Sequence, residues 1–162
     1  MAKVSLNDAL DKVEMTYQQI NEIAKDIVSE FFDQADSLIR ELKDVNELDN
    51  DSIRNYMIKL SLTSYSLSEV KEKSAMKAEI AETLRKESVA RNYIEATGTA
   101  SAKENEATLN SSSEMVSEAL FNLVSSLFKT KADEIHRVVD TLKSVLMSRN
   151  MEAKLTSNSI DG

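Results

Sequence analysis

The apolar positions in the first third of the chain recur in alternating steps of four and three residues. The row begins at Leu6 and comprises Leu6, Leu10, Val13, Tyr17, Ile20, Ala24, Ile27 and Phe31. This heptad spacing places every member along one side of a helix. After Phe31 a second step of four leads to Ala35, where the heptad phase slips and a supercoil would locally unwind. The pattern predicts a helix over residues 6–45, with Ser5 as its N-cap.

A polar, Asx-rich turn over residues 46–51 separates this helix from a second one over residues 52–97. Asp49 or Asp51 is the expected N-cap. The second helix begins with large apolar residues, but its later half is rich in Ala and Ser, which allow helix backbones to approach closely. Gly98 is the only internal glycine, and it predicts a left-handed C-cap after the helix.

The third long helix is predicted over residues 113–154. Capping-box patterns begin at Ser101 and Ser111, so residues 101–113 are expected to form a short helix and a loop. The apolar stripe of the last helix is wide enough to face more than one neighbour. It therefore predicts a homo-oligomer with an interface formed by Leu120, Leu123, Leu127, Val138 and Leu142. Residues 156–162 have no apolar periodicity and are expected to be a disordered tail.

These elements predict an all-α fold: an elongated bundle of three long helices with coiled-coil-like heptad packing. Residues 1–155 are expected to form a single helical domain, made of the acidic helix 6–45 and a helical hairpin over 52–154. No alternating apolar run or hairpin signal predicts a strand. The composition agrees, because the chain contains no Pro, Cys or Trp and only two Gly. Eight aromatic residues, four Tyr and four Phe, predict a slender, mostly aliphatic core.

The net charge of −8 is concentrated near the N-terminus. Residues 1–55 contain 6 Lys or Arg against 13 Asp or Glu, whereas residues 56–162 contain 14 against 15. The remainder of the chain is thus almost neutral and can carry local basic patches. Net charge alone does not exclude a nucleic-acid partner.

Catalytic chemistry lacks its usual residues in this sequence. There is one His, His136, no Cys, and none of the glycine-rich or zinc-binding motifs. Paired carboxylates are expected to be helix-surface charges, because a di-metal site in a helical bundle needs a Glu-x-x-His pair that is absent. We therefore expect no enzymatic activity, no metal and no cofactor.

Targeting signals are also lacking in this sequence. The first residues have no apolar segment typical of a signal peptide, and the longest uncharged apolar stretch, residues 119–128, is about half of the roughly 20 residues that span a bilayer. The expectation is a soluble cytoplasmic protein with no membrane partner.

The order of segments from residue 56 to residue 155 resembles a known family. A charged, Ala-rich stretch from Lys71 to Arg91 is followed by Tyr93 to Gly98 and then by the charged segment Ala102 to Ala107. An apolar last helix ends at Met147 to Glu152. These segments resemble the small helical recombination accessory proteins of tailed phages, the UvsY-type recombination mediators. The acidic helix 6–45 departs from that pattern.

The resemblance implies a homo-oligomer that binds single-stranded DNA and assists the loading of a recombinase, in the host cytoplasm if the protein is phage-encoded. The residues expected to contact phosphates are Lys71, Lys73, Lys77, Arg85, Lys86 and Arg91. Tyr65 and Tyr93 are the nearby rings. They can either stack on bases or pack between helices with a hydrated hydroxyl group.

Two other classes of function stay open at this stage. A coiled-coil protein-interaction module, for example a virion structural or scaffold component, uses the same heptads and needs no nucleic acid. An acidic inhibitor that mimics DNA would present a set of carboxylates to a basic enzyme site. That set comprises Asp33, Asp36, Glu41, Asp44, Glu47, Asp49 and Asp51.

Overall fold

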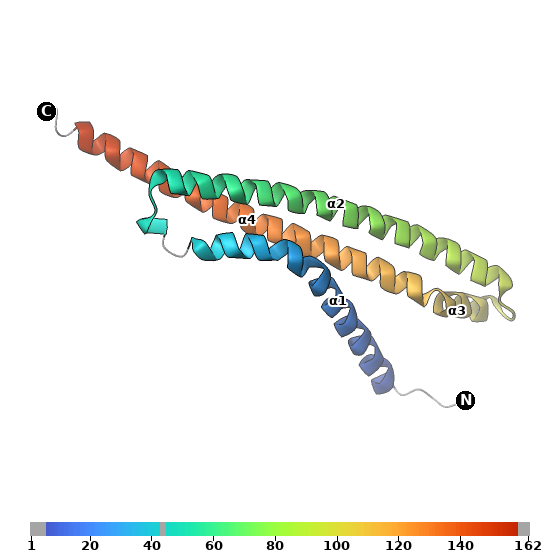
Figure 1. Cartoon of the computed structure of the whole chain (residues 1–162). Coiled ribbons are helices and arrows are strands. Elements are labelled where there is room, and N and C mark those ends of the chain that lie inside the picture. Colours follow the sequence, from blue (N-terminus) through green and yellow to red (C-terminus); the bar gives the residue numbers. More distant parts are fainter. Residues whose placement is uncertain (1–5, 43–44, 159–162) are drawn as a thin grey trace. The chain divides into compact units, whose positions relative to one another are not determined.

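The computed structural model describes the backbone of residues 6–42 and 45–158, and side chains from residue 14 to residue 156 within those ranges. It contains four α-helices, coloured along the chain in Figure 1. They are α1 (Leu6–Glu41), α2 (Asn50–Glu95), α3 (Ala100–Asn110) and α4 (Ser112–Asn158), with a 3-10 turn, η1 (Val45–Glu47), between α1 and α2. All regular structure in the described residues is helical, which confirms the all-α prediction.

The ends of the three long helices lie within four residues of the predicted positions. Two details differ. A fourth helix, α3, fills the segment that was expected to be a short helix and a loop, so only Ser111 separates it from α4. In addition, α4 continues to Asn158, so residues 156–158 are helical where a disordered tail was predicted. Ser5 and residues 159–162 lie outside the described residues.

The N-terminus of α2 is capped by Asp49, one of the two predicted residues. Its Oδ1 accepts a hydrogen bond from the backbone N–H of Ser52 at 2.7 Å, and the Ser52 hydroxyl donates to Oδ2 at 3.1 Å. These hydrogen bonds hold the pKa of Asp49 below its ordinary value. Asp51, the alternative cap, instead forms an ion pair with Arg54 at 2.7 Å.

The reversal after α2 depends on Gly98, which has a φ of 113°. A Cβ there would meet only Ala102 Cβ, at an ordinary 3.6 Å, so the backbone conformation rather than crowding favours glycine. The predicted cap of the next helix at Ser101 is wrong by two residues. Thr99 is the N-cap, because its hydroxyl accepts from the N–H of Ala102 and α3 has already begun at Ala100.

The described chain packs as two compact units, each built from parts of the long helices. The first unit contains residues 6–29 and 70–127, and the second contains residues 30–42, 45–69 and 128–158. The sequence predicted a single helical domain over residues 1–155. Over the described residues, none of the helices is apolar along enough of its length to cross a lipid bilayer.

In the second unit, segments of α1, α2 and α4 lie side by side, with α2 running opposite to the other two (Figure 1). Its core is formed by large side chains. Phe128 is fully buried, and the rings of Phe31 and Phe32 meet it edge-on with centroids 5.5 Å away. Ile53 and Leu60 from α2 are equally buried. This geometry suits the quadrupoles of the three rings and holds α1 against α4.

Lys131 joins the same two helices one turn further along α4. Its Nζ lies 2.5 Å from Asp36 Oδ1 and 2.8 Å from Glu134 Oε2, and 5.5 Å from the centre of the Phe32 ring. Burial, the largest single influence, lowers the pKa of Lys131. The hydrogen bonds and charges of the two carboxylates outweigh it, so the pKa is raised above its ordinary value. Lys131 therefore remains a cation.

Arg149 binds the connection between α1 and α2. Its Nη1 donates to Leu48 O at 2.6 Å and to Asn50 Oδ1 at 3.3 Å, and its Nη2 donates to the carbonyls of Val45 and Asn46 at 3.0 and 3.1 Å. Of these carbonyls, that of Val45 also accepts a hydrogen bond from the backbone N–H of Leu48 at 3.3 Å, which closes the turn. A planar guanidinium can reach all four acceptors at once, so one residue of α4 orders the whole turn.

The first unit has a core of small side chains. Ser74, Ala78 and Ala81 of α2 and Val124 of α4 are buried. Ser111, which was predicted to begin a capping box, is instead fully buried and joins three elements. Its Oγ lies 2.9 Å from Ala107 O and 3.0 Å from Ser88 Oγ, and it accepts from Asn92 Nδ2 at 3.1 Å.

Truncating the aromatic contact should destabilise the second unit. We expect Phe128→Ala to lower the free energy of unfolding by about 3–5 kcal/mol, because it leaves a cavity between Phe31 and Phe32. Urea denaturation followed by circular dichroism measures the change. Met147→Ala, at an exposed position on the same helix, should change stability by less than about 0.5 kcal/mol. A loss of the same small size for Phe128→Ala would contradict this account of the core.

Arg149→Lys should release the α1–α2 turn although it preserves the charge. An ammonium cannot serve four spread acceptors, so we expect a loss of about 1–2 kcal/mol and faster amide hydrogen exchange at residues 45–48. Arg137→Lys, at an exposed position of α4, is the matched control and should leave exchange in the turn unchanged. Unchanged exchange in Arg149→Lys would show that the turn does not depend on the guanidinium.

Candidate functional site

The six basic residues predicted to contact phosphates all lie on α2 in the first unit, but they do not share one side of the helix. At about 3.6 residues per turn, Lys73, Lys77 and Arg91 project in similar directions, and all three are exposed. Lys71 and Arg85 lie near the buried side and are half-buried. Lys86 projects in a third direction. The predicted strip is thus divided into separate groups.

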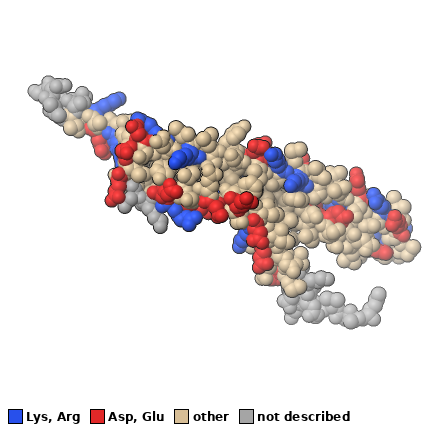
Figure 2. Space-filling view, viewed as in Figure 1, with Lys and Arg blue, Asp and Glu red and all other residues tan. Residues whose placement is uncertain are grey.

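Several of these cations already have partners within the first unit. Arg85 Nε lies 2.6 Å from Glu118 Oε2 on α4, and Lys86 Nζ lies 2.7 Å from Glu82. Lys77 Nζ stands 5.4 Å from the centre of the Phe121 ring. On the face shown in Figure 2, blue and red side chains are interspersed. Arg85 therefore has a structural role between α2 and α4.

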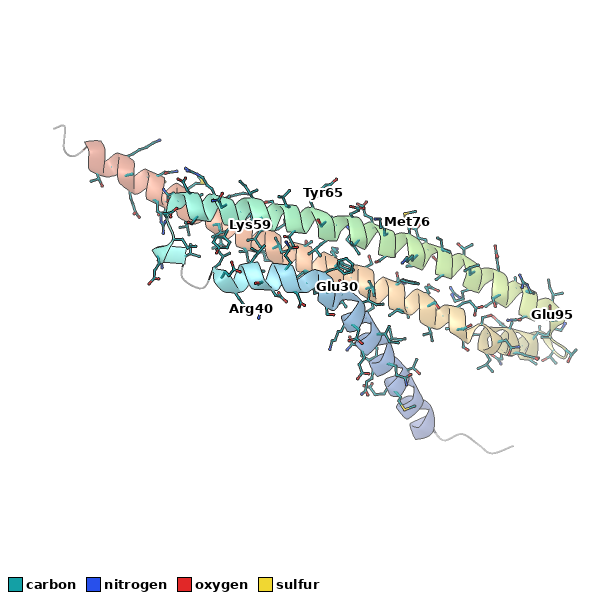
Figure 3. The ribbon with its side chains drawn as sticks, in the orientation of Figure 1. Glu30, Arg40, Lys59, Tyr65, Met76 and Glu95 are labelled. Carbon is teal, nitrogen blue, oxygen red and sulfur yellow. The ribbon has the colours of Figure 1, made fainter. Side chains whose placement is uncertain are left out.

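The two tyrosines near the predicted strip differ in their surroundings. Tyr65, in the second unit, is exposed and points away from its own unit, on the outer side of α2 (Figure 3). It does not pack between helices, which was one of the two alternatives. Tyr93, in the first unit, lies beneath Lys103 Nζ, 5.9 Å from the ring centre.

The residues predicted to form the oligomer interface are divided between the two units. Leu120, Leu123 and Leu127 are half-buried in the first unit, and Val138 is half-buried in the second. Leu142 is buried by its own chain. The wide apolar stripe of α4 is therefore used in part within the chain, because Val124 and Phe128 on the same helix are also buried.

The acidic set proposed for DNA mimicry is largely engaged in local structure. Asp36 binds Lys131, Asp49 caps α2, and Asp51 pairs with Arg54. Glu41 accepts a hydrogen bond from the Tyr56 hydroxyl at 3.1 Å. Asp44 lies outside the described residues.

One feature that the sequence did not predict is a row of exposed apolar residues on α2 in the second unit. Ile58, Leu62 and Tyr65 are 59%, 64% and 76% exposed. Their spacing of four and three is visible in the sequence. It was obscured by a second apolar row on the same helix, of which Leu60 and Leu67 are the buried members.

A groove of about 450 Å³ borders this row. It lies between α2 and α4 within the second unit. Its apolar lining is formed by Met57, Ile58, Leu62 and Val139. Arg54 and Lys143 supply two positive charges, and Ser61 completes the lining. The arrangement is an apolar groove with a basic rim, which suits an apolar segment that carries acidic residues.

The first unit also exposes apolar side chains, described here separately. On α2 they include Met76, which projects outward in Figure 3, together with Ile80 and Leu84. On α1, Ala24 of the heptad row and Val28 are buried, whereas Ile27 of the same row and its neighbour Ile23 are 40% and 49% exposed. The heptad row of α1 is thus only partly covered.

The described residues contain no group of three His, Asp or Glu side chains that could hold a metal ion. His136 lies on α4, with its Nε2 3.0 Å from the hydroxyl of buried Ser64. Its geometry is that of a helix-surface histidine bound to a neighbouring helix.

Comparison of this chain with protein-family models, with curated proteins and with solved structures finds no match.

Proposed function

We propose that this protein is a non-enzymatic helical interaction module that associates with itself through apolar side chains that its own fold leaves uncovered. The observation that supports it is the row Ile58, Leu62 and Tyr65 beside the apolar groove of the second unit. Contiguous exposed apolar surface with a polar rim is typical of protein-interaction sites. Isolated exposed apolar residues would carry no such meaning.

We also propose the heptad packing of the long helices that the sequence predicts. The long helices would pack by heptad-like seams, with helices of another copy covering the rows that remain exposed. Each row has the spacing of a helix-packing stripe, because its members recur every three or four residues. The half-buried positions Leu120, Leu123 and Leu127 of α4 would add to such a seam in the first unit.

Leu62→Asp should weaken self-association by placing a carboxylate in the exposed apolar row. We expect the wild type to show a mass above 18.1 kDa in light scattering at micromolar concentration, and the variant to shift toward that chain mass. Asn150→Asp, at an exposed position of α4 in the second unit that does not line the groove, adds the same charge and should keep the wild-type mass.

Both variants should keep the helical circular dichroism spectrum of the wild type, because neither position is buried. A wild type that scatters as a monomer, with a mass that Leu62→Asp leaves unchanged, would refute self-association.

A second candidate function is weak binding of single-stranded DNA, as the phage-family resemblance implies. One observation favours it: Lys73, Lys77 and Arg91 are exposed and recur on similar sides of α2 in the first unit. Three cations on one helix would give modest, sequence-independent affinity that depends on salt. Glu87 lies among them and would oppose the contact with phosphate.

Charge reversal at Lys77 and Arg91 should abolish retention of single-stranded DNA if this second function exists. Arg85 is left unchanged, because its reversal would also break the pair with Glu118. The logarithm of affinity should fall linearly with the logarithm of salt concentration, and each cation removed should flatten that slope. Reversal of Lys129, at an exposed position of α4 in the second unit, serves as the control. A wild type that retains no DNA at low salt would remove this candidate.

A further inference from the structure

We propose that the groove of the second unit receives α1 of a second copy of this chain, with Ile23 and Ile27 seated against Ile58 and Leu62. This inference rests on the proposed function and names the partner. The two apolar rows have the same spacing along their helices. Ile23 and Ile27 form a row spaced by four residues, and so do Ile58 and Leu62. Such rows interdigitate when two helices pack as ridges into grooves.

Charge supports the same occupant. The groove is rimmed by Arg54 and Lys143. Asp26 flanks the occupant row because it lies three residues after Ile23, next to it on the helix surface. The described side chains of α1 in the first unit include Glu14, Glu22 and Asp26 against one cation, Lys25. An apolar row with an acidic flank thus meets an apolar groove with a basic rim.

Arg54 and Lys143 form ion pairs with Asp51 and Asp140. These pairs do not prevent either cation from binding a carboxylate of a second copy. Both pairs join residues three apart on one helix, and the side chains of Arg54 and Lys143 are 56% and 55% exposed. Exposed pairs of this kind contribute little stability. A carboxylate from a second copy can therefore compete for either cation or share it.

Stoichiometry favours a closed dimer. Each chain supplies both the α1 row and the groove of the second unit, so a dimer with two-fold symmetry would make both contacts at once. The dimer would bury the row of α1 that the monomer leaves half covered, together with the apolar row of α2. Two equal contacts formed together also strengthen each other through effective concentration.

Cysteine cross-linking tests the pairing directly, since the natural chain has no Cys. One preparation carries Ile27→Cys, and the other, labelled with ¹⁵N, carries Leu62→Cys. After mixing, subunit exchange and mild oxidation, we expect a disulfide-linked heterodimer in the mixture and little linked product from either variant alone. Ser29→Cys mixed with Leu62→Cys is the matched control, because Ser29 is exposed on a different side of α1.

A charge exchange tests the rim. Asp26→Lys or Lys143→Glu should each weaken dimerisation by about two- to fivefold, and the heterodimer of the two variants should recover the wild-type affinity. Lys129→Glu, at an exposed position of α4, controls for net charge and should have no effect.

Three results would overturn the proposal. Efficient linkage of Leu62→Cys alone would show that the α2 rows pair with each other. Linkage of Ile27→Cys no better than that of the Ser29→Cys control would exclude α1 as the occupant. After either of these two cross-linking results, the proposed self-association would still stand if the wild type is an oligomer that Leu62→Asp dissociates. A monomer that is insensitive to Leu62→Asp would remove both proposals.

Discussion

The edge-on contact of Phe128 with Phe31 and Phe32 determines how α1 packs on α4 in the second unit. It places Asp36 beside Lys131, so the aromatic contact around buried Phe128 and an ion pair act on the same pair of helices. Arg149 then binds the carbonyls of the α1–α2 turn, which fixes the third helix of that unit. Each step uses a side chain of α4. This helix therefore organises the second unit, although the heptad row of α1 is the clearest pattern in the sequence.

The two units differ in what fills their cores, and a difference in stability is expected to follow. Phe128, Ile53 and Leu60 bury large apolar areas in the second unit, whereas Ala78 and Ala81 bury little in the first. The first unit relies on close backbone approach and on polar contacts such as Arg85–Glu118 and the Ser111 cluster. Regions with less buried apolar area open at lower free-energy cost, so hydrogen exchange should be faster there.

Helices with this much apolar surface create the condition for self-association. Leu62 and Tyr65 on α2 are exposed although their spacing is that of a buried stripe, and Ile23 on α1 is half exposed. Exposed apolar surface of this kind lowers the solubility of a protein unless a partner covers it. The acidic charge of residues 1–55 opposes non-specific aggregation and at the same time distinguishes α1 from the basic rim of the groove. In the proposed dimer, specificity would depend on charge, while the free energy of association would come from apolar burial.

The sequence alone determined which segments are helical and nearly where they end. Heptad spacing, a cap at Asp49 or Asp51 and the turn at Gly98 are local properties that neighbouring residues specify, and the structure shows that Asp49 is the cap. The sequence did not determine which of several apolar rows is buried. Periodicity places Leu60 and Leu62 on different sides of α2, but only the tertiary structure shows which side meets α4. The basic residues show the same limit. Arg85 and Lys77 belong to one charged stretch of the sequence, but Arg85 contacts Glu118 and Lys77 contacts the ring of Phe121, both on α4. Composition cannot reveal such contacts, because they depend on how segments far apart in the chain are brought together.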